Sequence, residues 1–153
     1  MARKQNFKSE DGNKGTIYVQ MGSAEYSHIW GIDDAVGWGC ANDEFDVLLV
    51  QYLLNKSSSA TGHDTLVTDG LFGNKTAAAV RAFQKGENRQ FKGICHVDGR
   101  VDPFKGRNVS TISKTVYAII MLNFEMAAIR PVYFLNPAMD PDLPVKLLDV
   151  LKP

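Results

Sequence analysis

The stretch from Asp69 to Gln84 constrains the fold more than any other part of the chain, because it predicts a tight turn that leads directly into an amphipathic helix. Asp69-Gly70 is a strong turn dipeptide: glycine accepts a positive φ, and the Asp carboxylate can accept hydrogen bonds from backbone N–H groups two residues on. Asn74 is the expected N-cap of the helix. One apolar stripe at 3.6-residue spacing follows, formed by Thr76, Ala79, Val80 and Phe83.

Two more helices are predicted on either side of this stretch. The first begins at Asn42 or Asp43 and ends near residue 55, before a serine-rich loop. Its wide apolar face consists of Val47, Val50, Leu53 and Leu54. The other is capped by Ser110 or Thr111 and ends near Ile129, because Pro131 cannot continue a helix.

The two ends of the chain are expected to contain little helix. Residues 1–14 are polar and expected to be mobile or held only at Phe7. Residues 15–21 predict a short strand, and a second strand is expected around residues 28–32. Residues 132–135 are apolar enough to pack as a strand or an extended segment of a Pro-rich tail. A last helical turn is indicated by Leu147, Leu148 and Leu151.

Composition indicates one domain with its own core. The 17 Lys and Arg residues balance the 17 Asp and Glu residues, which argues against nucleic acid or an anionic membrane surface as the main partner. The N-terminal charges are followed by no apolar segment typical of a signal peptide, so we expect synthesis in the cytoplasm and a signal-independent route for any delivery to the periplasm or cell wall. We expect Cys40 and Cys95 to be reduced structural thiols.

A second turn, from Val97 to Pro103, weakly repeats the first. Both turns place an apolar residue near Asp-Gly, another apolar residue two positions after the glycine, and then a helix. In the second copy the helix is delayed by an inserted segment that begins at Phe104.

The motifs together resemble the bacterial peptidoglycan-binding-domain-like family over roughly residues 33–124. The resemblance rests on three motifs in order: a first helix at residues 46–55, the turn and helix at 69–84, and the second turn at 97–103. The string at residues 36–42 resembles a subgroup found in secreted bacterial proteins and cell-wall-degrading fusions. Two departures from the family pattern are Asn74, where proline is common, and the insertion after the second turn.

The resemblance implies a mostly α fold, a compact three-helix peptidoglycan-binding-domain-like bundle at residues 33–130. A short N-terminal strand and loop extension would occupy residues 1–32. An extended Pro-rich C-terminal tail would occupy residues 131–153 and pack on the domain.

The polar residues that this pattern leaves near the groove between helices are the expected ligand contacts. Glutamine can bond an amide through both its oxygen and its nitrogen, and arginine can bond a carboxylate with two parallel N–H groups. The groove candidates are Gln51, Tyr52, Asp69, Arg81, Gln84 and Arg100. Trp30 and Trp38 are candidates for stacking on sugar rings, although large aromatic residues more often belong to a core.

Signals for catalysis or metal binding are weak. Zinc sites usually carry paired ligands at short spacing, and neither Cys-x-x-Cys nor His-x-x-x-His occurs. The adjacent acids Asp33-Asp34 and Asp43-Glu44 more often cap a helix than act as glycosidase carboxylates. A nucleophilic pair of Cys40 or Cys95 with a distant histidine stays open. We therefore expect no enzyme activity, no cofactor and no metal.

Three functions compete at this point. The leading prediction is a non-catalytic bacterial cell-wall-binding module whose partner is peptidoglycan or its fragments. The alternative is an adaptor or cargo component of a bacterial or phage delivery system, such as type VI secretion, that keeps the fold and binds a secretion-apparatus, effector or hydrolase protein. The third is a small cell-wall hydrolase.

Overall fold

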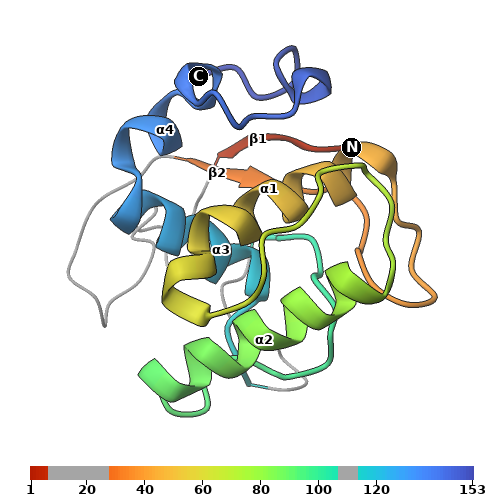
Figure 1. The fold of residues 1–153 in the computed structure, drawn as a ribbon, viewed down its shortest axis with the longest axis vertical. Helices are drawn as coiled ribbons and strands as arrows, with labels where there is room; N and C mark the ends of the chain where they lie inside the picture. The colour runs from red at the N-terminus through yellow and green to blue at the C-terminus, as the bar shows by residue number, and fades with distance from the viewer. Residues whose placement is uncertain (7–27, 107–113) are drawn as a thin grey trace.

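The computed structural model describes residues 1–6, 28–106 and 114–153 of the chain. This part is mostly helical with a small N-terminal sheet, as expected (Figure 1). Its helices are α1 (Glu44–Thr61), α2 (Asn74–Gln90), α3 (Ala118–Ile129) and α4 (Pro131–Leu135). Two strands, β1 (Arg3–Asn6) and β2 (His28–Gly31), and two 3-10 turns, η2 (Pro137–Met139) and η3 (Val145–Leu147), complete it.

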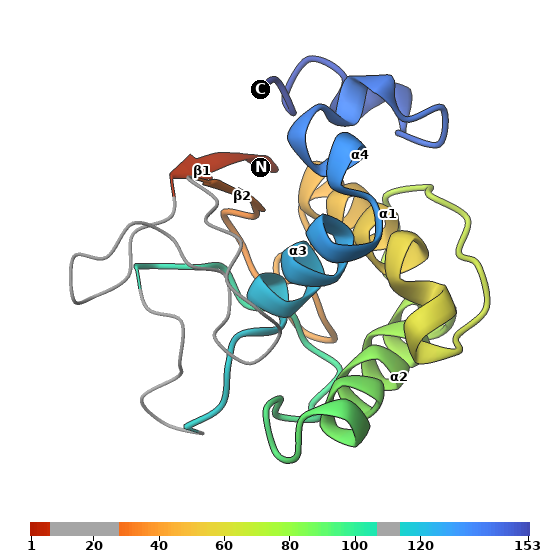
Figure 2. The same ribbon diagram turned by 90° about the vertical axis from the view of Figure 1, so that its left-hand side faces the viewer.

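Helix α1 lies at the centre of the molecule and packs against both α2 and α3 (Figures 1 and 2). Its predicted apolar face is fully buried, as is the stripe of α2 that ends at Phe83. Helix α3 is buried from Ala118 to Ala127 because α1, β2 and α4 all contact it. With only 12 residues, α3 falls short of a bilayer's thickness, and the described part of the chain contains no helix able to cross one.

Helix α1 begins as predicted but extends past its predicted end. The Asp43 carboxylate accepts hydrogen bonds from the N–H groups of Phe45 and Asp46, so Asp43 is the N-cap. The helix then runs through the serines to Thr61, where a loop was expected. Ser57 is buried within this extension, and its hydroxyl donates to the Leu54 carbonyl.

The starts of α2 and α3 differ from the prediction. Gly73, in an extended conformation and without a side-chain cap, occupies the N-cap of α2, so Asn74 is its first helical residue. Helix α3 begins only at Ala118, whereas the expected caps Ser110 and Thr111 lie outside the described residues. The late start follows from Val116, whose N–H bonds the Ile94 carbonyl and holds this segment extended.

Residues 1–6 are held in place, contrary to the expected mobility, whereas the rest of the stretch 1–14 lies outside the described residues. Strand β1 pairs antiparallel with β2, which confirms the strand expected near residue 28. Arg3 holds the strand to Asp33 through an ion pair, and Gln5 donates to the Phe104 carbonyl. The strand expected at residues 15–21 lies outside the described residues.

The segment after Pro131 is the helix α4, not a strand or extended chain. Proline suits the first helical position because it has no N–H to leave unbonded and its φ is already helical. The following tail is held on α1 by a buried cluster in which the Tyr52 hydroxyl donates to Asp140 and Lys56 pairs with the same carboxylate. Leu147 and Leu151 are fully buried, so the tail is part of the core.

A pair of buried carboxyl groups faces each other between α2 and α3. Glu87 is fully buried and Glu125 is 3% exposed, and three of their four oxygens have no hydrogen-bond donor if both groups are ionised. A proton held by one carboxyl supplies a hydrogen bond to the other. Burial, followed by repulsion from Glu125, raises the pKa of Glu87 to about 9, and burial also raises the pKa of Glu125.

Candidate functional site

The first Asp-Gly turn is held by one side chain of α1. The Gln51 amide nitrogen lies 3.1 Å from each of Asp69 Oδ1, the Leu71 carbonyl and Thr76 Oγ1, while its oxygen accepts from the Gly70 N–H at 3.0 Å. The turn needs glycine, because Gly70 has φ +75° and an added Cβ would lie 2.7 Å from the Glu44 side chain. The Leu71 N–H, which donates to the Asp69 carboxylate, lowers the pKa of Asp69, and the Gln51 bond lowers it further.

The second Asp-Gly turn is held in the same way by α2. The Gln84 nitrogen donates to Asp98 Oδ1 at 3.0 Å and to the Arg100 carbonyl at 3.1 Å. Its oxygen accepts from the N–H groups of Asp98 and Gly99 at 3.2 and 2.9 Å. The φ of Gly99 is +72°, and the exposed Arg81 side chain lies against this glycine. The weak repeat in the sequence is therefore a repeated device, which we call the glutamine clamp: Gln51 with the first turn and Gln84 with the second.

An asparagine repeats the device four residues after each clamp glutamine. The Asn55 side chain exchanges two hydrogen bonds with the backbone of Leu66, and the Asn88 side chain exchanges two with the backbone of Cys95. Leu66 and Cys95 each lie three residues before the Asp of the following turn. The signal Gln-x-x-x-Asn on both helices was available in the sequence and was missed.

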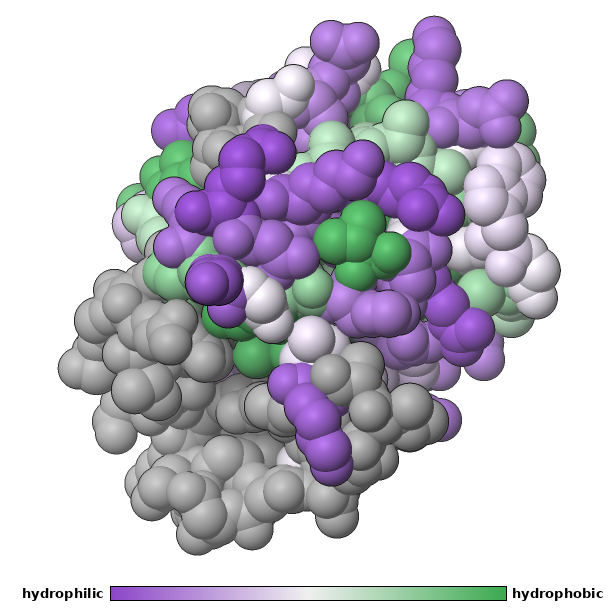
Figure 3. Space-filling view, turned by 90° about the horizontal axis from the view of Figure 1, so that it is seen from below, coloured by the Kyte–Doolittle hydropathy of each residue, from purple (hydrophilic) through white to green (hydrophobic). Residues whose placement is uncertain are grey.

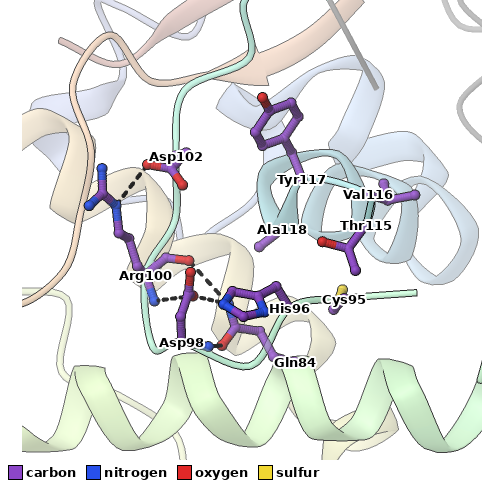
Figure 4. Close-up of a pocket in the computed structure, with 10 residues that line it drawn as sticks. All are labelled: Gln84, Cys95, His96, Asp98, Arg100, Asp102, Thr115, Val116, Tyr117 and Ala118. Carbon is purple, nitrogen blue, oxygen red and sulfur yellow. Dashed lines mark hydrogen bonds and ion pairs between the residues drawn. The ribbon is translucent and has the colours of Figure 1, made fainter. Parts of the chain in front are cut away.

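A pocket of about 200 Å³ lies beside the second turn (Figure 4). Arg100 and Asp102 form one side, and Thr115 and Tyr117, from the segment that leads into α3, form the other. His96 lies between the two sides above the clamp. Arg100 donates from Nε to Asp102 Oδ1 at 2.8 Å, so its orientation is fixed while about half of its side chain stays exposed.

A second hollow of about 410 Å³ adjoins this pocket. It shares Arg100, Asp102 and Tyr117 with the first and continues toward Asp33 and Lys105. We call the two hollows together the turn groove. The late start of α3 shapes this groove, because the segment before it lies extended along its edge.

Residues 45–104 match the family model described as "Putative peptidoglycan binding domain". The matched segment is 60 of the 153 residues, and it is similar to that family. The match includes both glutamine clamps and one side of the turn groove, and it confirms the resemblance noted in the sequence. No curated protein and no solved structure matches the chain.

The peptidoglycan-binding-domain segment places the predicted groove residues in two groups. Gln51 and Gln84 are 1% exposed and hold the turns, and Tyr52 is also buried with its hydroxyl on Asp140. These three side chains therefore support the site from within and are not exposed to a ligand. Three exposed candidates remain: Asp69 at the first turn and Arg81 and Arg100 at the second.

The two tryptophans are in contrasting positions. Trp30 is fully buried, and its indole N–H donates to the Phe134 carbonyl, so it has no face for a ligand. Trp38 is 61% exposed and contacts Phe72 edge to face. His96, Asp102 and Tyr117 were not among the predicted residues, and only the turn motif could have indicated Asp102.

The two cysteines lie in different surroundings. Burial raises the pKa of Cys95 to about 12, which disfavours the thiolate. Cys40 is a free thiol that donates to the Trp38 carbonyl. Within residues 1–6, 28–106 and 114–153, no three His, Cys, Asp or Glu side chains gather where they could hold a metal ion.

The coloured part of the face seen from below, where α2 lies, is largely hydrophilic with small hydrophobic spots (Figure 3). Charged side chains along α2 account for much of this character, among them Lys75, Lys85 and Arg89, all exposed. A polar surface of this kind suits a ligand made of amides, carboxylates and hydroxyls better than an extended apolar partner.

Proposed function

We propose that the chain binds peptidoglycan or its fragments without cleaving them, and that the turn groove receives the peptide part. The observation that carries the proposal is Arg100, held by Asp102 and exposed on the side of the turn groove that the matched segment forms. Nε is the bonded donor, which leaves the terminal N–H groups for a carboxylate.

The turn groove is preorganised for such a ligand. The Gln84 clamp fixes the backbone that carries Arg100, so little conformational entropy is lost when a ligand binds. Tyr117 and His96 line the same pocket as Arg100 and add hydrogen-bonding groups to it. The stem peptides of peptidoglycan present carboxylates and amides, which match these donors.

Two observations support binding without catalysis. The thiol beside the groove, Cys95, is buried with a raised pKa and is a poor nucleophile. The buried His28 has a lowered pKa because of burial, and it stacks on Phe134. Incubation with purified sacculi followed by analysis of released muropeptides tests this part: release by the wild type would establish the hydrolase reading instead.

Arg100→Ala should weaken binding to sacculi about tenfold or more, since a charge-assisted hydrogen bond to a carboxylate is lost. The measurement is the fraction of protein that sediments with insoluble sacculi over a range of sacculus concentrations at low salt. Arg89→Ala, an exposed arginine at the end of α2, is the matched control and should bind like the wild type. Wild-type protein that stays in the supernatant would contradict the proposal.

A protein partner is the second candidate, favoured by exposed apolar side chains on α4 and the turn after it. Val132 and Met139 are 58% and 60% exposed beside a hollow of about 440 Å³. An adaptor of a bacterial delivery system would place its partner there. Affinity capture from the native bacterium, compared with a Val132→Ser/Met139→Ser variant, tests it: the same proteins recovered with both would rule out this surface.

A further inference from the structure

Trp38 is exposed at the tip of a loop that is otherwise firmly held. The Asn42 side chain accepts from the Gly37 N–H at 2.8 Å and donates to the carbonyls of Gly37 and Cys40. The Cys40 N–H also bonds the Gly37 carbonyl at 3.1 Å. The loop is therefore rigid, yet 61% of its large aromatic side chain meets solvent.

The loop is joined to the turn groove through Arg100. Val36 and Val101 form a two-way backbone bridge with hydrogen bonds of 2.9 and 2.8 Å, which fixes the Trp38 loop against the second turn. A Cβ on Gly37 would lie 3.3 Å from Arg100, so glycine lets the two segments approach. On the other side, Trp38 contacts Phe72 of the first turn at 5.1 Å between ring centroids.

An exposed indole on a rigid loop that packs against the segment carrying Arg100 matches a sugar ring that carries an acidic branch. The C–H face of a pyranose stacks on an aromatic plane, and the adjacent arginine can bond the carboxylate of the branch. The neighbouring Gly39 has open space around it, so a ligand can approach the backbone there. A protein partner would need a broader apolar surface, whereas the exposed aromatic group here is one side chain on a loop bridged to the segment that carries Arg100.

We propose that Trp38 forms a glycan subsite that continues the turn groove, so that the ligand is a glycopeptide with its sugar on Trp38 and its peptide branch at Arg100. This inference rests on the proposed function and deepens it. Trp38 lies outside the residues that match the family model, so the subsite is an addition by this chain to the family segment.

Trp38→Ala should reduce binding to sacculi about tenfold, and Trp38→Phe should restore part of it. Val132→Ala, which also removes an exposed apolar side chain, should leave binding unchanged. Addition of a β-1,4-linked N-acetylglucosamine tetramer should shift the tryptophan emission of the wild type and of Arg100→Ala to shorter wavelength. Trp38→Phe should show no shift, because the remaining tryptophan, Trp30, is buried.

The outcomes separate the two proposals. If the wild type sediments with sacculi but Trp38→Ala sediments equally well and the tetramer shifts no emission, the glycan subsite is refuted while peptidoglycan binding stands. If the wild type does not sediment, peptidoglycan binding is refuted and the subsite with it. Circular dichroism of Trp38→Ala should match the wild type, since the side chain is largely exposed.

Discussion

Replacing Glu87 with glutamine should raise the free energy of unfolding at pH 8 by about 2–4 kcal/mol. In the wild type, Glu87 keeps its proton in the fold up to its raised pKa of about 9, whereas in the unfolded chain it ionises near its ordinary value of 4.5. Between these values the native state binds more protons than the unfolded state, so stability falls as pH rises. Glutamine keeps the shape of the protonated group and cannot ionise.

The groups that face this carboxyl all act in the same direction. Glu125, on α3, repels the charged form of Glu87. Burial, Glu87 and Asp98 all raise the pKa of the neighbouring Cys95 thiol, so it adds no positive charge. Among the described residues, no cation contributes to the pKa of Glu87, so nothing counteracts the rise. We therefore expect the fold to retain a proton on this pair of carboxyls at neutral pH.

Chemical denaturation from pH 5 to pH 9 measures this effect. The free energy of unfolding of the wild type should fall by up to about 1.4 kcal/mol per pH unit for each proton that only the folded state retains. The free energy of unfolding of Glu87→Gln should depend less on pH. Asp149→Asn, at an exposed carboxyl in the tail, is the control and should follow the wild type. A variant curve as steep as that of the wild type would show that Glu87 ionises normally in the fold.

Gln84→Ala should lower the free energy of unfolding by about 2–4 kcal/mol and abolish binding at the turn groove. The change removes a side chain that makes four hydrogen bonds to the second turn and leaves buried backbone groups without partners. The backbone that carries Arg100 then loses its support, so binding is lost because the Arg100 side chain is no longer held in place in the groove.

Two other glutamines provide the comparison. Gln51→Ala breaks the equivalent clamp at the first turn, so it should cost similar stability while the second turn keeps its geometry. Gln90→Ala, at the exposed end of α2, should change neither property. Thermal unfolding and sacculus sedimentation measured on all three variants test the clamp, and unimpaired binding by Gln84→Ala would refute its role in the groove.

The repeated Asp-Gly turns and the helices α1 and α2 were predictable because local signals determine them. Glycine at positive φ, an acidic cap and a 3.6-residue apolar stripe each depend on neighbours in sequence. The roles of Gln51 and Gln84 were not predictable in the same way. A glutamine side chain can bond a ligand as well as it can bond a turn. Only the burial of Gln51 and Gln84, each 1% exposed, shows that they bond the turns.

Long-range contacts decided what the sequence left open. Helix α3 starts late because Val116 bonds Ile94, and β1 is ordered because a strand 25 residues away pairs with it. The turn groove combines the second turn with residues 115–117, beyond an insertion that has no local pattern. No spacing rule in the sequence connects Tyr117 with Arg100, so this part of the site required the fold.

The most direct measurement of the central claim is a map of backbone amide chemical shifts as a soluble muropeptide is added to the isotopically labelled chain. We predict that the shifted amides gather at residues 96–102 and 115–118 and at the Trp38 loop, with little change on α4 and the tail. Shifts confined to α4 and the tail, or none at saturating muropeptide, would contradict the account.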